Sequence, residues 1–178
     1  TIFLLISHMP GRLLPTIRSR CRLLRFTALD AAAMDGLLRR LLPDAPDAEL
    51  AALARVGQGA LGKALGFAKL KLAEIDQQLR RIASEGDREN ALRSELARHL
   101  ALASEKPRFA AMLVQASAVA ADAARAAHGP AIAKALAVRD EVLRLSAGAV
   151  STSEDAGTVT FLVAGALAGL APGAGRAS

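Results

Sequence analysis

The chain has 178 residues, of which 52% are hydrophobic and 3% aromatic, and it carries a formal net charge of +6. This length allows one good-sized domain or two small ones, and the abundance of Ala and Leu favours helices. Cys21 is the only cysteine, which excludes an internal disulfide and a zinc site built from several cysteines.

The positive charge is concentrated near the start of the chain. Residues 1–26 contain no Asp or Glu and five arginines, namely Arg12, Arg18, Arg20, Arg22 and Arg25. Of the 23 Lys and Arg residues, 18 therefore remain elsewhere, against 17 Asp and Glu residues. A general nucleic-acid-binding protein spreads basic residues over a whole face, whereas here they are focused on one loop.

The first residues predict a buried strand. Ile2–Ile6 is a continuous apolar run, as in strands of parallel sheets that are covered on both faces. A buried helix segment has the same pattern, but the β-branched and aromatic content favours a strand. Ser7 and His8 follow directly, at the carboxyl end of this strand, where open α/β sheets bind their ligands. Pro10-Gly11 then breaks the chain.

The stretch from Phe3 through Cys21 resembles the bacterial clamp-loader subunits of DNA polymerase III, which belong to the AAA+ class. These subunits have a hydrophobic strand, a polar sensor-1 residue, a Pro-containing turn and then a Ser-Arg-Cys motif, here Ser19-Arg20-Cys21. The resemblance implies that residues 1–26 end an AAA+ nucleotide-binding domain, most of which lies upstream. Ser7 matches the sensor-1 position and is a vestige if the subunit binds no nucleotide.

The same resemblance implies that Arg20 acts in trans as an arginine finger. A guanidinium is always charged and can bind a phosphate through two hydrogen bonds, so it can stabilise charge on a γ-phosphate that a neighbouring subunit holds. The alternative for Arg20 is a structural turn in which it pairs with a carboxylate. For Cys21, structural packing is favoured over a reactive thiol, and the three histidines form no metal pattern.

Residues 27–84 predict a small helical lid domain. Thr27-Ala28-Leu29-Asp30 has the spacing of a capping box, and an apolar stripe follows, with Leu29, Leu37, Leu38, Leu41 and Leu42. Pro43–Pro46 ends this helix. Asp47 is predicted to cap a second helix over 48–56, with Gly57 as its left-handed stop.

The stretch Gly59–Leu65 resembles the start of the family's sensor-2 helix. ATP-binding subunits place an Arg there, at the position that Gly62 occupies, whereas Lys63 matches an Arg of the delta-prime type, which does not hydrolyse ATP. The resemblance therefore points to the delta-prime type and against ATP sensing in cis. The alternative is a Gly-rich helix start that allows close packing. The Walker spacing of a phosphate-binding loop is absent.

The remaining chain predicts further helices. Periodic apolar residues continue from Leu72 to Ile82, and a linker is expected at 84–87. Three Ala-rich helices are expected over 88–104, 107–127 and 130–147, and a last apolar segment over 157–170, capped from 151–154. This last segment is too short to span a bilayer. The apolar residues that line the helices can form a bundle core; they are Leu92, Leu96, Leu100, Phe109, Met112, Leu113 and Val119.

The sequence thus predicts a mainly α chain with three parts: the end of an AAA+ α/β nucleotide-binding domain (1–26), a helical lid (27–84) and a helical collar (85–178). The resemblance implies a collar that holds five subunits together in a ring. It also implies partners, namely gamma/tau and delta subunits, the sliding clamp and primed DNA, in the cytoplasm. This chain would bind no cofactor, since ATP–Mg would be held by the neighbouring subunit.

Two other functions stay open. One is the ATP-hydrolysing gamma/tau type of subunit, which Gly62 argues against. The other is a helical scaffold unrelated to replication, in which the arginine cluster is a solvated face and Arg20→Ala changes no partner activity.

Overall fold

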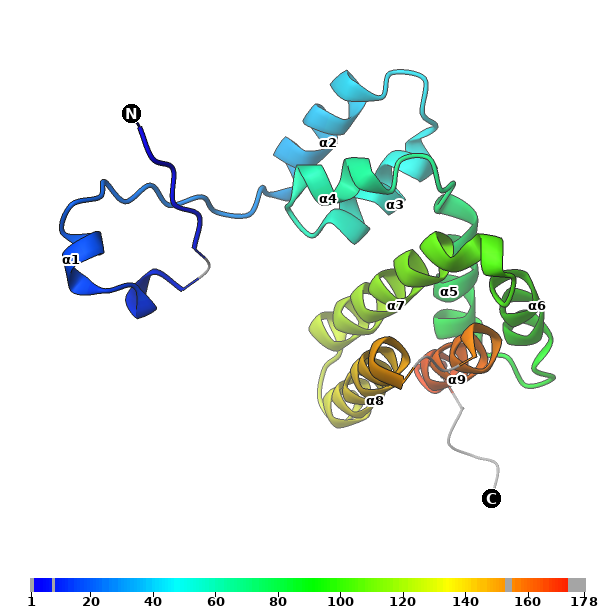
Figure 1. Cartoon of the computed structure of the whole chain (residues 1–178). Coiled ribbons are helices and arrows are strands. Elements are labelled where there is room, and N and C mark those ends of the chain that lie inside the picture. Colours follow the sequence, from blue (N-terminus) through cyan, green and yellow to red (C-terminus); the bar gives the residue numbers. More distant parts are fainter. Residues whose placement is uncertain (1, 8, 153–154, 173–178) are drawn as a thin grey trace.

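The protein is mainly helical, as the sequence predicts, and Figure 1 shows its helices in chain order. The computed structural model describes residues 2–7, 9–152 and 155–172, and within these ranges it contains no strand. The α-helices are α1 Pro15–Arg18, α2 Ala31–Leu41, α3 Asp47–Gly57, α4 Leu61–Gly66, α5 Ala73–Glu85, α6 Ala91–Leu100, α7 Lys106–Ala126, α8 Ala131–Thr152 and α9 Ala156–Ala168. Short 3₁₀ turns cover Pro10–Arg12 and Ala103–Glu105.

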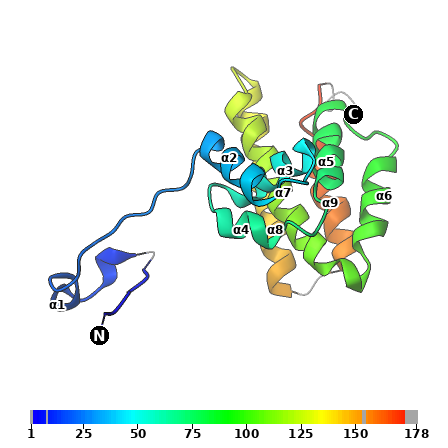
Figure 2. The ribbon, with the colours of Figure 1, turned by 90° about the horizontal axis from the view of Figure 1, so that it is seen from above.

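The strand predicted for Ile2–Ile6 is wrong. These five side chains are between 60% and 93% exposed, and the segment has no regular secondary structure. A strand needs a neighbour to pair its backbone N–H and C=O groups, and the described ranges supply none. Figures 1 and 2 show that the segment up to Phe26 lies apart from the other helices and is joined to α2 by extended chain.

Helices α2 and α3 lie where the sequence predicts helices, but their caps differ. Asp30, rather than Thr27, caps α2, because its carboxylate accepts a 2.8 Å hydrogen bond from the Ala33 amide. Helix α3 begins at Asp47 itself, after Pro46. It ends at Gly57, and the left-handed residue that follows is Gln58 with φ 50°. These shifts are small, because the apolar spacing, not the cap, determines which face is buried.

The C-terminal helices form a bundle in which α7 and α9 occupy the middle. Helix α7 packs against α8, α5 and α3, and α9 packs against α6, α8, α5 and α7. One apolar core runs through all of them and through α2–α4. Its large, fully buried members include Met34, Leu38, Leu53, Leu72, Ile75, Leu79, Ile82, Leu96, Leu100, Met112 and Leu167.

Two predicted connections are shorter than expected. Helix α5 continues through Glu85, so only Gly86, with φ 80°, and the residues after it form the linker. Helix α8 continues through Thr152, and Ser153 and Glu154 of the predicted cap lie outside the described residues. Asp155 caps α9 instead, since its carboxylate accepts a 2.7 Å hydrogen bond from the Thr158 amide.

Helix α5 bears on the predicted division into lid and collar, which stays a prediction. The predicted lid, residues 27–84, includes nearly all of α5, yet this helix packs against α6, α7 and α9 as well as against α3. In the ranges that the structure covers, no helix is long and apolar enough to cross a membrane.

Candidate functional site

The Ser19-Arg20-Cys21 motif forms a backbone turn directly after α1. The Arg20 amide donates to the Ile17 carbonyl at 3.1 Å, and the Cys21 amide donates to the Arg18 carbonyl at 3.4 Å. The Ser19 hydroxyl donates to the Thr16 carbonyl at 3.2 Å. The turn is therefore held by local backbone contacts, and the Arg20 side chain contributes nothing to them.

The Arg20 guanidinium is exposed and makes no ion pair or hydrogen bond to any described residue. The alternative in which Arg20 pairs with a carboxylate in a structural turn is thus not observed in this part of the chain. Arg18, Arg22 and Arg25 are also exposed and unpaired here, and Arg12 has only a 4.0 Å contact with the Met9 sulfur. Cys21 is exposed rather than packed.

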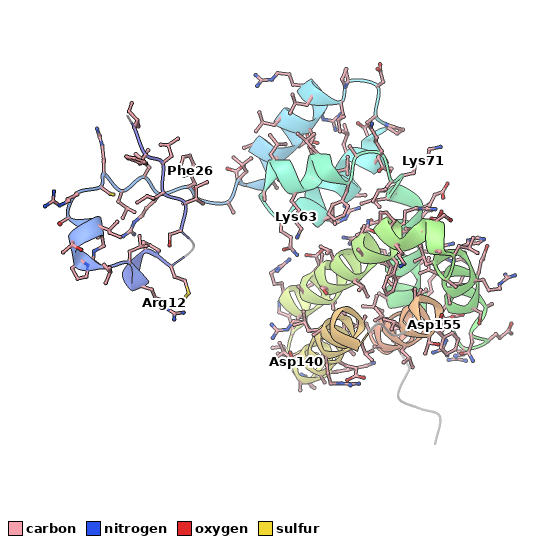
Figure 3. The ribbon with its side chains drawn as sticks, in the orientation of Figure 1. Arg12, Phe26, Lys63, Lys71, Asp140 and Asp155 are labelled. Carbon is pink, nitrogen blue, oxygen red and sulfur yellow. The ribbon has the colours of Figure 1, made fainter. Side chains whose placement is uncertain are left out.

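The structure does not bring the three predicted site residues together. The Ser7 hydroxyl accepts a 3.2 Å hydrogen bond from the Met9 amide and is exposed. Lys63 lies on α4 and is exposed, and Figure 3 shows it apart from the segment that carries Arg12 and Phe26. No contact joins Ser7, Arg20 and Lys63 within the described ranges, and His8 lies outside them. Their predicted roles stay predictions.

The glycines around α4 differ in whether close packing requires them. A Cβ on Gly59, which has φ +81°, would lie 2.7 Å from the Ala28 Cβ, and one on Gly57 would lie 2.8 Å from the Ala64 Cβ. A Cβ on Gly62 would meet nothing within 4 Å. Close packing therefore accounts for Gly57 and Gly59, but not for Gly62.

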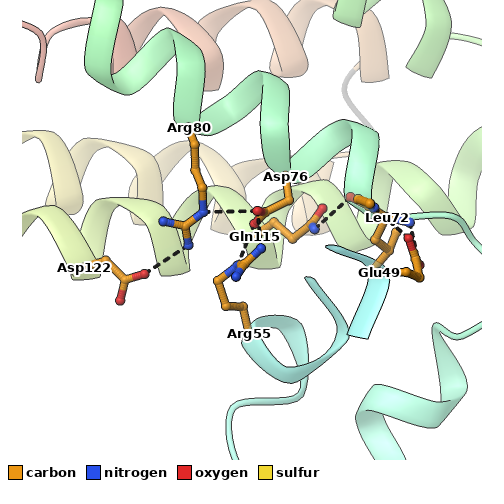
Figure 4. A network of polar contacts seen from close by, with 8 residues as sticks. Glu49, Arg55, Leu72, Asp76, Arg80, Gln115 and Asp122 are labelled. Carbon is orange, nitrogen blue, oxygen red and sulfur yellow. Dashed lines mark hydrogen bonds and ion pairs between the residues drawn. The ribbon is translucent and has the colours of Figure 1, made fainter. Parts of the chain in front are cut away.

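The structure shows a polar network between α3, α5 and α7 that the sequence did not predict (Figure 4). The buried Asp76 carboxylate of α5 accepts hydrogen bonds from Arg55 of α3 and from Arg80 one turn later. Arg80 also donates to Asp122 of α7 at 3.2 Å. Only the i,i+4 spacing of Asp76 and Arg80 is visible in the sequence; the partners from α3 and α7 are 21 and 42 residues away.

Metal chemistry has no visible basis in the described residues, because no group of three or more His, Cys, Asp and Glu side chains there could hold an ion. One carboxylate at a helix end has a shifted pKa. The Thr158 amide and hydroxyl donate to Asp155 and lower the pKa of this carboxylate below its ordinary value. These contacts belong to the N-terminal cap of α9.

Comparison with known proteins gives one informative match. Over 59 residues, which are 33% of the chain, the sequence is 48% identical to DNA polymerase III subunit delta' of Pseudomonas aeruginosa. The matched part spans 18% of that protein's length. No model of a protein family matches the chain, and neither does a solved structure. A third of the chain is therefore similar to a delta' subunit.

Proposed function

We propose that this chain is part of a clamp-loader subunit of the delta-prime type, which helps to load the sliding clamp onto primed DNA. The similarity to a delta' subunit over 59 residues is the single observation that carries this proposal. The helical body supports it, since a helical collar is what the resemblance implies. In this proposal the body binds the gamma/tau and delta subunits, and the complex works in the cytoplasm.

Within that complex, Arg20 serves the ATP site of an adjacent subunit. The guanidinium is exposed and has no carboxylate partner among the described residues. It is therefore available to a phosphate outside the chain, which it can bind through two charge-assisted hydrogen bonds. A guanidinium so placed stabilises the charge that develops on the transferred phosphoryl group.

The subunit itself does not hydrolyse ATP. Gly62 has no side chain that could reach a phosphate. A Cβ at this position would meet no atom within 4 Å, so close packing does not require a glycine there. The gamma/tau alternative expects an Arg at this position. ATP–Mg is accordingly held by the neighbour, Ser7 is a vestige of a sensor, and Lys63 has at most a minor electrostatic part.

The Arg20→Ala substitution tests this role in the natural protein, assembled with its ATPase partners on primed DNA. We expect the ATPase rate of the adjacent site to fall roughly tenfold or more, because fingers of this kind contribute large rate factors. Arg20→Lys should rescue it only weakly, since an ammonium lacks the planar fork.

Arg22→Ala is the matched control, since Arg22 is an exposed, unpaired arginine of the same segment. It should leave the ATPase rate near that of the parent. Size-exclusion chromatography of each variant complex separates lost catalysis from lost assembly. An Arg20→Ala complex that assembles and hydrolyses ATP at the parent rate would contradict the proposed role and favour the scaffold alternative.

A further inference from the structure

Helix α5 has no N-terminal cap of its own. Leu72 occupies the N-cap position, and no side chain of α5 satisfies the first amides. Glu49 of α3 does so instead: its two carboxylate oxygens accept hydrogen bonds from the Leu72 and Ala73 amides, both at 2.8 Å. Because the N-terminus of a helix has unpaired N–H groups and a partial positive charge, a carboxylate there is stabilising. The first turn of α5 thus depends on α3.

The same peptide group is held from the opposite side by α7. The Gln115 side chain, which is fully buried, donates from Nε2 to the Leu72 carbonyl at 3.2 Å. The Leu72 side chain is itself completely buried in the core. Leu72 therefore has its amide fixed by α3 and its carbonyl fixed by α7 (Figure 4).

Asp76, which follows Leu72 by four residues, is likewise linked to both α3 and α7, here through charged side chains. Its side chain is 6% exposed and accepts from the Arg55 Nε of α3 at 2.8 Å, with a second bond from Arg55 Nη2. Arg80 Nε donates to it at 3.0 Å and extends the chain of contacts to Asp122 of α7. Every polar link in this network involves a residue between Leu72 and Arg80, at the N-terminal end of α5.

Directional polar contacts fix geometry in a way that apolar packing does not. The core between α2–α4 and α5–α9 is apolar and continuous, and apolar contact depends on area rather than on angle. A buried carboxylate, by contrast, must keep its donors, because a charge left without partners in the interior is strongly unfavourable. The network therefore restricts the orientation of α3 on α5 more tightly than the core alone.

We propose that Glu49, Arg55, Asp76 and Gln115 form a joint that fixes the α2–α4 group against the α5–α9 group. The joint lies at the first turn of α5, and it gives the two groups one relative orientation. This inference concerns the helical body alone and does not depend on the proposed role of Arg20 or on any partner.

The joint can be tested by pulsed electron-spin distance measurements on the natural protein. With Cys21→Ser to remove the native thiol, spin labels at Asp44→Cys, just after α2, and Ala137→Cys, on α8, report the distance between the groups. Both positions are exposed. The parent should give one narrow distance peak, and Glu49→Gln and Arg55→Met should each lose it in favour of a broad or divided distribution.

Arg81→Met is the control, because Arg81 lies on α5, the helix that carries Asp76, but pairs with Glu85 at the exposed surface. It should keep the narrow peak. Retention of the same peak by Glu49→Gln and Arg55→Met would overturn the inference. Circular dichroism checks that each variant keeps its helices.

Amide hydrogen exchange provides a second test that needs no substitution. The Leu72 and Ala73 amides should exchange much more slowly than those of Leu61 and Gly62 in the first turn of α4, which has no side-chain cap. Equal exchange at the two helix starts would show that Glu49 does not hold α5, and it would also overturn the joint.

Discussion

Arginines and large apolar side chains have opposite surroundings in the N-terminal segment, residues 2–26, and in the helical body, residues 31–171. In the segment, arginines are exposed without carboxylate partners among the described residues, and Ile2–Ile6 is exposed. In the body, leucines fill a core, and many arginines pair with carboxylates. The paired ones are Arg39, Arg55, Arg80, Arg81, Arg93, Arg108, Arg125, Arg139 and Arg144.

This difference predicts that the arginines of the two regions respond differently to substitution. Arg55 of the body has its charge compensated by the buried Asp76 carboxylate, so its removal is expected to affect folding or helix orientation. Arg20 has no such partner in the described residues, and its removal is expected to leave the fold unchanged. The following substitutions test this distinction, from the largest expected effect on stability to the smallest.

Substitution of a core leucine should lower the free energy of unfolding far more than substitution of a leucine in the N-terminal segment. Leu79→Ala, at a fully buried position of α5, should lower the free energy of unfolding by about 3 kcal/mol, because it removes buried apolar contacts and leaves a cavity. Leu4→Ala, at a position 86% exposed, should change it by less than about 0.5 kcal/mol. Urea denaturation followed by circular dichroism measures both, and equal effects would show that Leu4 is buried in solution.

The buried ion pairs come next. Asp76→Ala should destabilise the protein by about 2 kcal/mol, since it leaves the partly buried Arg55 without a carboxylate, whereas Arg80 keeps Asp122. Arg20→Ala should leave the urea midpoint unchanged. The control is Asp35→Ala, which breaks the exposed pair with Arg39 and should cost less than about 1 kcal/mol. A large loss with Arg20→Ala would contradict the division between the two regions.

Two glycines of the body, Gly59 and Gly62, should respond to substitution by alanine in opposite directions. Gly59→Ala should destabilise by roughly 1–2 kcal/mol, because an alanine would have to adopt a left-handed conformation and would meet Ala28 and Leu29. Gly62→Ala should stabilise α4 by up to about 1 kcal/mol. Thermal unfolding of both variants measures this difference, and a destabilising Gly62→Ala would restore the packing explanation for that glycine.

The smallest effect is a dependence on pH at the start of α9. The pKa of Asp155 lies below its ordinary value of 3.8, because the Thr158 amide and hydroxyl donate to the carboxylate. The cap is therefore fully formed above this ordinary value, and its contribution is lost as the pH falls through the lowered pKa. Titration of the Asp155 carboxyl by nuclear magnetic resonance should give a value below 3.8, and in Thr158→Val it should move upward.

The sequence predicted the helical body well because the signal there is local. Apolar residues spaced for a helix face located α2, α5 and α7, and Leu38, Leu79 and Met112 are buried as such spacing requires. Helix ends were less accurate, since Asp30 and Thr27 both fit the start of α2 and only the geometry distinguishes them. The predicted strand failed for a different reason: a strand is completed by a neighbour, which Ile2–Ile6 does not have in the described residues.

The joint around Leu72 could not be predicted at all. Glu49 lies directly before Leu50 in α3, and its sequence position alone does not show which groups its carboxylate contacts. The structure explains why it is buried: α5 has no cap of its own, and the Glu49 carboxylate accepts from the amide at its start. The exposed state of Arg20 likewise required the structure, because its spacing fits a paired and an unpaired arginine equally well.

Assembly with the other subunits tests most directly whether this chain serves in a clamp loader, as we propose. The natural protein is mixed with gamma/tau and delta subunits, the mass of the product is measured by light scattering, and clamps loaded onto primed DNA are counted with and without the chain. The account predicts one stable complex and loading that is lost when the chain is omitted. A protein that remains separate from these subunits, with loading unaffected by its presence, would contradict the proposed function.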